Sequence, residues 1–581
     1  MLRGPDTRLR LITSLLVAAL LPVIAQLVRI QILEHPRYVE EAEQLIRRHY
    51  GLPEPPWGTI WDRQGALLIG NTPVYDVGIE ANLITDTVQT ARQLAPLLAR
   101  PPAEIQADLT LNRAEKTLVH VWRPLAKDIP QATQEKIAAL GVPGITFSAG
   151  WRRYYAEGEL AAHLLGFVNE AGQGAGVQPY YLRFLQGKQV SNQGEVTPYA
   201  EPLAEELANE HTIPYPGTDL YLTIDRTLQA YVEGELAQAI REYHAESGTI
   251  LVSAPRTGEI LALANYPTYE PARYSEYAAR DETDCFQNPA ISYNYEPGSV
   301  FKVVTAAAAL DSGRVDLDWS YQDVGSLEYG GVVVKNWNRA AYGQQDLEGA
   351  LAHSLNVGMA TLSTRVLGKE LFYDYVRAFG FGQPTGVGLA GEAAGVVHTP
   401  TDWDWAESFL ATNAYGQGIA VTPLQMLSAV GAVANEGTMM RPYVVGKRVY
   451  PDGEAVRVPP HPLGQPISPE TAETLTELLA RVVEREIPLA QVSGYRIAGK
   501  SGTAQIPGVG GYEQEAVIAS FIGFGPLPEP QLLIFVKLDR PAVAPAYRWG
   551  SYTAAPVFQR VAERLFVLLG IPPDDVVATS Q

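Results

Sequence analysis

Strand patterns lie at both ends of the region that follows residue 217, with helical patterns between them. At its start, residues 219–224 alternate in polarity, and Asp225 is placed to cap the helix that follows. Two apolar runs, 249–252 and 260–264, are joined by a Pro- and Gly-containing turn, which predicts a hairpin. Further strands are predicted near the other end, at residues 495–498, 517–524 and 532–538, before a C-terminal helix with Val557, Val561, Leu565 and Leu568 on one face. These patterns predict one antiparallel sheet with helices packed on its faces.

A serine and a lysine three positions apart, Ser299 and Lys302, open an apolar helical pattern in the middle of this region. Positions three apart share a helix face, so the lysine can reach the serine hydroxyl. A serine hydroxyl is a poor nucleophile until a nearby base takes its proton. The start of a helix also favours negative charge developing on that oxygen. The pair therefore predicts a nucleophile and its base.

Two further motifs follow in order along the chain. In the first, Ser354 offers a hydroxyl that could pass a proton to a leaving amine, and Asn356 offers an amide for Lys302 and a substrate amide. The second lies at the end of the strand predicted at 495–498. Its Lys500, Ser501 and Thr503 suit a carboxylate ligand, and Gly502 allows a substrate backbone to approach closely.

Each motif alone is weak, because such spacings occur by chance on solvated helices and in ordinary turns. All three in order, each in a suitable local structure, argue against chance. Lys302 must be neutral to act as a base. We expect desolvation and a second cation nearby, Lys500, to lower the pKa of Lys302.

An uncharged, Leu- and Val-rich stretch covers residues 11–28, between Arg10 and Arg29. As a helix it would be about 27 Å long, close to the hydrocarbon thickness of a bilayer. Arg3, Arg8 and Arg10 on its short N-terminal side predict a cytoplasmic N-terminus and an extracytoplasmic main body. A cleaved signal peptide is the alternative, but no A-x-A-like site follows the stretch. We therefore expect a single-pass protein of the cell membrane.

Composition excludes several classes of function. The 581 residues predict two or more domains, and the formal net charge of -20 disfavours nucleic-acid binding. The single cysteine, Cys285, excludes an intramolecular disulfide, and its acidic neighbours disfavour a reactive thiolate. The nine histidines show no metal-binding spacing, so no metal site is expected, and His353 beside Ser354 is interpreted as incidental.

The three motifs together resemble those of penicillin-binding proteins and serine β-lactamases. Over nearly its whole length the sequence is similar to the class B, monofunctional penicillin-binding proteins. The segments that carry this resemblance are 295–302 (YEPGSVFK), 222–225 (LTID), 415–418 (YGQG), 500–505 (KSGTAQ), 58–65 (GTIWDRQG) and 153–168 (RYYAEGELAAHLLGFV).

The resemblance implies an α+β architecture in several parts. A tail and membrane helix (1–33) would precede an elongated, non-catalytic α+β pedestal of the dimerisation type (34–205). A linker (206–216) would then lead to a penicillin-binding, β-lactamase-like transpeptidase domain (217–572) with an antiparallel five-stranded sheet flanked by helices, and a short tail (573–581) would end the chain.

The resemblance also implies a peptidoglycan D,D-transpeptidase that uses no cofactor and is a target of β-lactam antibiotics. The implied roles are an acylated nucleophile and its base (Ser299, Lys302), proton transfer and substrate placement (Ser354, Asn356), and binding of the terminal D-Ala carboxylate (Lys500, Ser501, Thr503, with Gly502 beside them). Backbone N–H groups of Ser299 and Thr503 would form the oxyanion hole. The implied partner is a polytopic lipid II polymerase.

Other functions stay open as alternatives. A β-lactamase or β-lactam-sensing receptor shares the three motifs, although the long pedestal argues against it. A non-catalytic scaffold for wall-synthesis partners would be favoured if Ser299 or Lys500 were missing, and both are present. Within class B, residues 519–523 (ASFIG) resemble the septal, cell-division branch, so we predict that type, with the elongation type as its alternative.

Overall fold

The computed structural model describes residues 55–80, 83–114, 123–191, 212–508 and 511–574, together with residues 21–22, 26–29 and 34. The membrane helix predicted at 11–28 lies largely outside these residues. No helix within the described part is long and apolar enough to cross a membrane.

The chain forms two compact units, and neither is one continuous stretch. The first unit includes Asn71–Tyr154 and Gln186–Gly217. The second includes Thr59–Gly70, Tyr155–Leu185 and the chain from Thr218 onwards. Each unit has its own apolar core, so each is described by itself.

The central strand of the first unit is β2 (Leu67–Ile79), most of which belongs to this unit. It pairs with the two strands β3 and β4, whose bounds are given below. Its core is apolar and includes Leu94, Ile105 and Leu109. Asp86 caps the first helix by accepting a hydrogen bond from the backbone N–H of Gln89. The other elements of this unit are α3 (Thr87–Leu98), α4 (Pro102–Ala114), β3 (Arg123–Pro130), α5 (Gln131–Ala138), β4 (Ile145–Tyr155), β7 (Lys188–Ser191) and β8 (Thr212–Tyr215).

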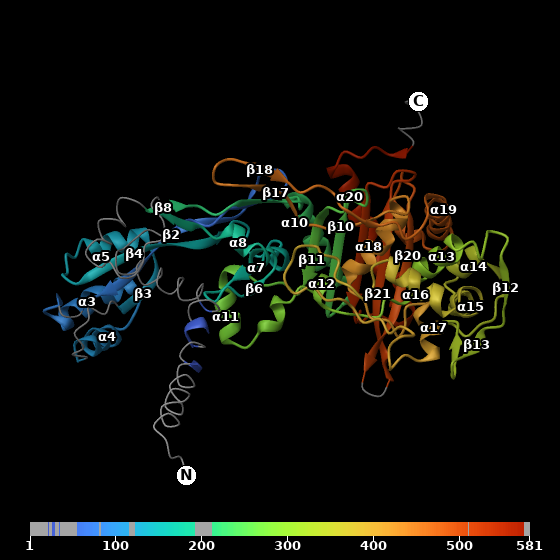
Figure 1. The fold of residues 1–581 in the computed structure, drawn as a ribbon, viewed down its shortest axis with the longest axis horizontal. Helices are drawn as coiled ribbons and strands as arrows, with labels where there is room; N and C mark the ends of the chain where they lie inside the picture. Colours follow the sequence, from blue (N-terminus) through green and yellow to red (C-terminus); the bar gives the residue numbers. More distant parts are fainter. Residues whose placement is uncertain are drawn as a thin grey trace, which may run out of the picture. The chain divides into compact units, whose positions relative to one another are not determined.

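A five-stranded antiparallel sheet forms the centre of the second unit, as the family resemblance implied (Figure 1). Its strands, in spatial order, are β11 (Ile260–Tyr266), β10 (Ser247–Ser253), β22 (Leu532–Asp539), β21 (Gly511–Gly525) and β20 (Ala498–Gly508). The edge strand β20 begins at Ala498, whereas the sequence predicted a strand that begins at residue 495. Residues 495–497 turn away because Tyr495 donates to the Ile571 carbonyl and the Arg496 N–H donates to Asp574.

The strand predicted at 219–224 forms as β9 (Asp219–Leu222), but it belongs to another sheet, so the prediction of a single sheet was wrong. β9 pairs in parallel with β1 (Ile60–Trp61) and antiparallel with β17 (Val445–Val449), which pairs with β18 (Ala455–Arg457). The Asp219 carboxylate fixes this arrangement by accepting a hydrogen bond from the Thr59 N–H at 2.6 Å.

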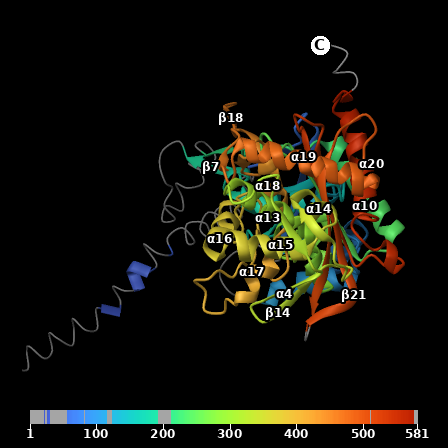
Figure 2. The ribbon, with the colours of Figure 1, turned by 90° about the vertical axis from the view of Figure 1, so that its right-hand side faces the viewer.

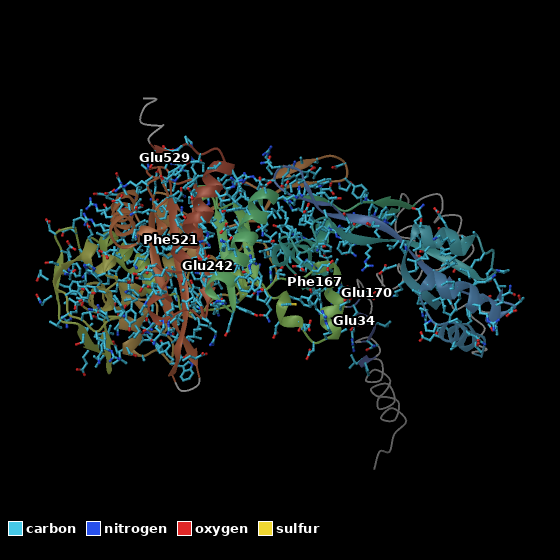
Figure 3. The ribbon with its side chains drawn as sticks, turned by 180° about the vertical axis from the view of Figure 1, so that it is seen from behind. Glu34, Phe167, Glu170, Glu242, Phe521 and Glu529 are labelled. Carbon is cyan, nitrogen blue, oxygen red and sulfur yellow. The ribbon has the colours of Figure 1, made fainter. Side chains whose placement is uncertain are left out.

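Two helices cover one face of the five-stranded sheet: α10 (Arg226–Tyr243) and α20 (Ala554–Leu568). Asp225 caps α10 as predicted, accepting from the N–H groups of Thr227 and Leu228. Phe521, labelled in Figure 3, points from β21 onto Phe558 of α20, with ring centroids 4.7 Å apart.

The opposite face of the same sheet is covered by a helical layer that includes α18 (Pro423–Ala434), as Figure 2 shows. The longer helices of this layer also include α13 (Lys302–Asp311), α14 (Leu347–Ala352), α15 (Asn356–Thr361), α16 (Lys369–Ala378), α17 (Glu407–Asn413) and α19 (Pro469–Glu486).

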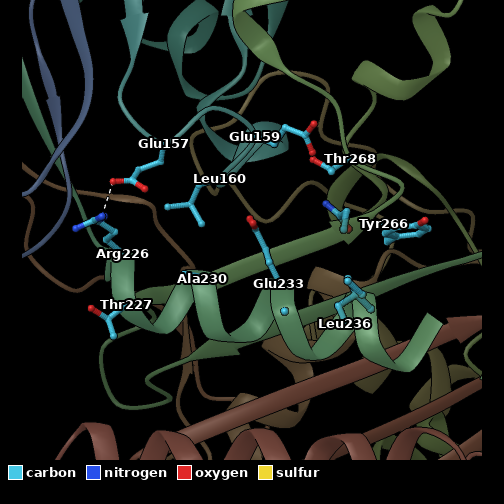
Figure 4. Close-up of a pocket in the computed structure, with 13 residues that line it drawn as sticks. Glu157, Glu159, Leu160, Arg226, Thr227, Ala230, Glu233, Leu236, Tyr266 and Thr268 are labelled. Carbon is cyan, nitrogen blue, oxygen red and sulfur yellow. Dashed lines mark ion pairs between the residues drawn. The ribbon is translucent and has the colours of Figure 1, made fainter. Parts of the chain in front are cut away.

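The segment Tyr155–Leu185 packs within the second unit beside α10. There, Glu157 forms an ion pair with Arg226, and Glu233 accepts a hydrogen bond from the Ala161 N–H. Glu157, Arg226 and Glu233 line a pocket of about 730 Å³, shown in Figure 4. None of the site residues predicted from sequence lines this pocket.

Candidate active site

Ser299 lies in a single 3₁₀ turn, η5 (Gly298–Phe301), directly before α13. The sequence predicted a helix opening at this serine, and the first turn is tighter than an α-helix. In a 3₁₀ turn, positions three apart eclipse one another, which places Lys302 on the face of Ser299. Ser299 is partly exposed, and none of the described residues forms a hydrogen bond with its hydroxyl. The hydroxyl is thus open to solvent and to a ligand.

Lys302 is fully buried at the start of α13, and its Nζ contacts the second motif. It donates to the Ser354 carbonyl at 2.7 Å and to Asn356 Oδ1 at 2.8 Å, and Ser354 Oγ lies 3.1 Å away. The two shortest contacts are with oxygens that can only accept, so they use both hydrogens of a neutral amine. The amine lone pair is left for a hydroxyl.

Ser354 lies between α14 and α15 in the left-handed region, with φ of 53°. Side chains other than glycine rarely adopt this conformation. The turn is closed by the Leu355 N–H, which donates to the Ala350 carbonyl at 2.9 Å. As a result Ser354 Oγ lies between two amines, 3.1 Å from Lys302 and 3.3 Å from Lys500.

Both lysines are buried, and neither has an acidic partner within the described residues. Burial, with the positive charge of Lys500 as a second cause, holds the pKa of Lys302 well below its ordinary value. Burial also lowers the pKa of Lys500, to about 8. A lowered pKa favours the neutral amine, which is the form that a general base requires.

Lys500, Ser501, Gly502 and Thr503 all lie inside β20 rather than at the end of a strand, where the sequence placed them. Gly502 faces the turn of Ser299: a Cβ built on it would lie 3.3 Å from the Pro297 carbonyl oxygen and 2.5 Å from Ser520 Oγ. A larger residue would therefore push β20 away from the nucleophile turn.

Sequence reasoning missed a loop beyond β22 that contacts Thr503. The Gly550 N–H donates to Thr503 Oγ1 at 3.1 Å. A Cβ on Gly550 would meet the Gly502 and Ser520 carbonyl oxygens at 2.2 and 2.3 Å, so only glycine fits there. The preceding Trp549 packs edge to face with Trp337 at 5.2 Å. The only signal in the sequence was a Trp-Gly pair in a loop rich in Pro and Ala.

The residues interpreted as incidental have ordinary structural roles. His353 stacks on Tyr342, and its carbonyl accepts from the Trp337 indole N–H. Burial raises the pKa of the Cys285 thiol, which does not favour a thiolate nucleophile. The described residues hold no group of three His, Cys, Asp or Glu side chains suited to a metal ion.

Comparison with known proteins agrees with this geometry. Residues 248–563 match the model of the penicillin binding protein transpeptidase domain, and residues 53–222 match that of the penicillin-binding protein dimerisation domain. Stage V sporulation protein D of Bacillus subtilis is 32% identical, over 90% of this chain and 79% of its own length. The chain belongs to the class B penicillin-binding proteins.

Other class B penicillin-binding proteins are similar over comparable lengths. Peptidoglycan D,D-transpeptidase FtsI of Escherichia coli is 29% identical, over 89% of this chain and 84% of its own. The crystal structure of penicillin binding protein 3 from Mycobacterium tuberculosis has a TM-score of 0.67 at 29% identity, covering 90% of this chain and 98% of that one. That protein has also been crystallised with aztreonam and with ampicillin.

Proposed function

We propose that this chain is a peptidoglycan D,D-transpeptidase that acts through a Ser299 acyl-enzyme. The observation that carries the proposal is the buried cluster of Lys302, Ser354, Asn356 and Lys500. Both amines lie within hydrogen-bond distance of the Ser354 hydroxyl, and burial lowers the pKa of Lys302. Class B membership and the names of the relatives support the same reaction.

In the first half-reaction, Ser299 Oγ attacks the carbonyl carbon of the penultimate D-Ala of a stem peptide, and its proton passes to Lys302 Nζ. The developing oxyanion lies against the backbone N–H groups of Ser299 and Thr503. The C–N bond to the terminal D-Ala then breaks, and the leaving amine takes a proton through Ser354 Oγ. Lys500, Ser501 and Thr503 bind the carboxylate of the departing residue.

In the second half-reaction, an amine from a neighbouring peptidoglycan strand attacks the ester carbonyl of the acyl-enzyme. This amine loses its proton to the same groups, Ser354 and Lys302. The C–O bond to Ser299 breaks, and its oxygen is reprotonated from Lys302. A β-lactam would acylate Ser299 by the same first step, with ring opening in place of loss of D-Ala. For cross-linking to occur, the acceptor amine must reach the Ser299 ester before water hydrolyses it.

The test is labelling of the purified protein with a fluorescent penicillin, with Ser299→Ala as the loss variant and Ser312→Ala as a matched control. Ser312 directly follows α13, and its hydroxyl donates to the Ala309 carbonyl, away from the cluster. A stable adduct in the wild type and the control, absent in Ser299→Ala, supports the proposal. Steady turnover of the β-lactam would favour a β-lactamase, and no adduct at all would favour a scaffold.

The proposal includes a place for the chain in the cell. We propose that residues 11–28 anchor it in the cytoplasmic membrane, that residues 34–205 form a pedestal and 217–572 the transpeptidase domain, and that a lipid II polymerase is its membrane partner. The arginine-flanked apolar stretch supports the anchor, and the two family-model matches support the division into domains. Protease accessibility in spheroplasts tests the topology, and co-purification with the polymerase tests the partner.

The septal type is our proposal within class B, supported by the resemblance of residues 519–523 to that branch. Depletion of the protein should then give filaments with blocked septa. Rounded cells that still divide would instead indicate the elongation type.

A further inference from the structure

Glu296, three residues before Ser299, has a carboxylate that binds two distant parts of the chain. Its Oε1 accepts from the Gly418 N–H at 2.9 Å, and its Oε2 accepts from the Tyr512 hydroxyl at 3.0 Å. No lysine or arginine of the described residues forms an ion pair with it. Burial raises the pKa of Glu296, and the two hydrogen bonds oppose that rise. The carboxylate is thus held by neutral donors alone.

The backbone by itself fixes one of these two connections. Tyr295 and Val421 exchange two backbone hydrogen bonds at 2.9 Å, and the Gly298 N–H donates to the Gly416 carbonyl at 3.0 Å. The segment around Gly418 therefore stays against the nucleophile turn without help from Glu296. The second connection, to Tyr512, depends on the side chains.

Tyr512 lies near the tip of the β20–β21 hairpin, where it is opposite Pro507. Strand β22 pairs with β21 only from Ile518 onwards, so the hairpin beyond that point is a two-stranded ribbon. An isolated two-stranded ribbon is marginally stable in water. Among the described residues, two side-chain contacts hold this ribbon in place. Tyr512 binds Glu296, and Glu513 binds Arg540 through two hydrogen bonds at 2.6 and 2.7 Å.

The hairpin and the nucleophile turn are in close contact just below that tip. A Cβ built on Gly298 would lie 3.1 Å from the Ala504 Cβ and 3.3 Å from the Thr503 carbonyl oxygen. The oxyanion donors proposed above, the N–H groups of Ser299 and Thr503, belong one to each of these elements. Thr503 pairs with Ala519, next to the point where the ribbon begins. A ribbon displaced from Glu296 would therefore pull on this end of β20 and widen the gap between the two donors.

We propose that Glu296 and Tyr512 are a positioning pair: their hydrogen bond ties the β20–β21 hairpin to the turn of Ser299 and fixes the spacing of the oxyanion donors. Neither residue contacts the reacting atoms in this inference. It rests on the proposed acylation of Ser299. It assigns Glu296 a role that the lysine and serine motifs leave out.

The experiment compares four variants of the full chain. Tyr512→Phe removes only the hydroxyl, Glu296→Ala removes both contacts, and Glu296→Gln keeps an acceptor for Gly418 and a partner for Tyr512. Glu513→Gln is the matched control, because it weakens the neighbouring ion pair without touching the nucleophile turn. Fluorescent-penicillin acylation is measured over a concentration series, which separates the limiting acylation rate from the half-saturating concentration.

We expect Tyr512→Phe and Glu296→Ala to lower the limiting rate about ten-fold, with little change in the half-saturating concentration. Glu296→Gln should recover most of the rate, and Glu513→Gln should match the wild type. A wild-type limiting rate in Tyr512→Phe, or an equal loss in Glu513→Gln, overturns the inference.

Amide hydrogen exchange gives a second readout that does not need activity. In Tyr512→Phe, exchange should accelerate in the described residues 505–508 and 511–513, and the sheet below should keep its protection. If the wild-type protein is not labelled by the fluorescent penicillin, the proposed function fails. Hydrogen exchange alone then tests whether the Glu296–Tyr512 hydrogen bond holds the hairpin. Unchanged exchange in Tyr512→Phe overturns the tether in either case.

Discussion

Replacing Asn356 by aspartate puts a carboxylate where the amide oxygen lies 2.8 Å from Lys302 Nζ. The substitution keeps the side chain's shape and changes its charge. A carboxylate at this distance stabilises the protonated amine, so the pKa of Lys302 should rise. Because the proposed base works only when neutral, a higher pKa lowers the fraction of active enzyme at a given pH.

The size of the effect follows from the distance. Two unit charges 2.8 Å apart attract by about 6 kcal/mol at an effective dielectric constant of about 20, which corresponds to about 4 pKa units. The net rise is smaller, because the new carboxylate is itself desolvated and can no longer donate to the Lys335 carbonyl. We expect a rise of about 1 to 3 units, with acylation falling about ten-fold for each unit by which the pKa of Lys302 exceeds the assay pH.

The assay is the second-order rate of acylation by a fluorescent penicillin from pH 5 to 10 (about one unit per step). The acid limb of the profile should move to higher pH in Asn356→Asp, and alkaline pH should restore part of the rate. Asn356→Ala separates loss of the amide from gain of charge. Asn338→Asp adds the same charge at an exposed position near Tyr342. A folded Asn356→Asp variant whose acid limb stays in place would refute the role of Lys302 as base.

Two further predictions concern stability. Gly416 has φ of 79°, and a Cβ there would lie 2.3 Å from the Gly298 carbonyl oxygen, so Gly416→Ala should destabilise the fold by about 2 kcal/mol or more in urea unfolding. Gly313→Ala, also at positive φ but with open space around it, should cost less, and equal losses would contradict the close contact. Burial lowers the pKa of His163 from 6.5 to about 4, so the unfolded chain binds the proton more tightly and stability should fall by up to about 3 kcal/mol as pH drops from 6.5 to 4. His163→Gln should remove that part of the slope, and an unchanged slope between pH 7.5 and 4.5 would rule His163 out as its source.

Local sequence signals predicted the parts of the fold that depend on neighbours in the chain. The Asp225 cap needs only the residues just after it, and the β10–β11 hairpin needs only its own turn. The proximity of Lys302 to Lys500 was predicted from the motifs, since a lysine base must be kept neutral in some way. The division into a pedestal, a linker and a transpeptidase domain was predicted from the family resemblance.

What the sequence did not reveal depends on contacts between distant residues. Nothing local shows that β9 pairs with β1, about 160 residues earlier, instead of joining the five-stranded sheet. The positive φ of Ser354 is set by the hydrogen bonds around it, and no glycine marks it. The bond between Tyr512 and Glu296 joins residues 216 positions apart, and neither motif nor periodicity signals it.

The position of β20 at the border of its sheet has one more consequence. Within the described residues only β21 pairs with it, so its outer side has no strand partner and can accept one more extended segment. Such an edge is a template that any extended peptide can join, and strand addition by itself selects for no sequence. Selection must then come from the side chains beside the template. A strand whose end carries a carboxylate gains the charge of Lys500, and a strand without one does not.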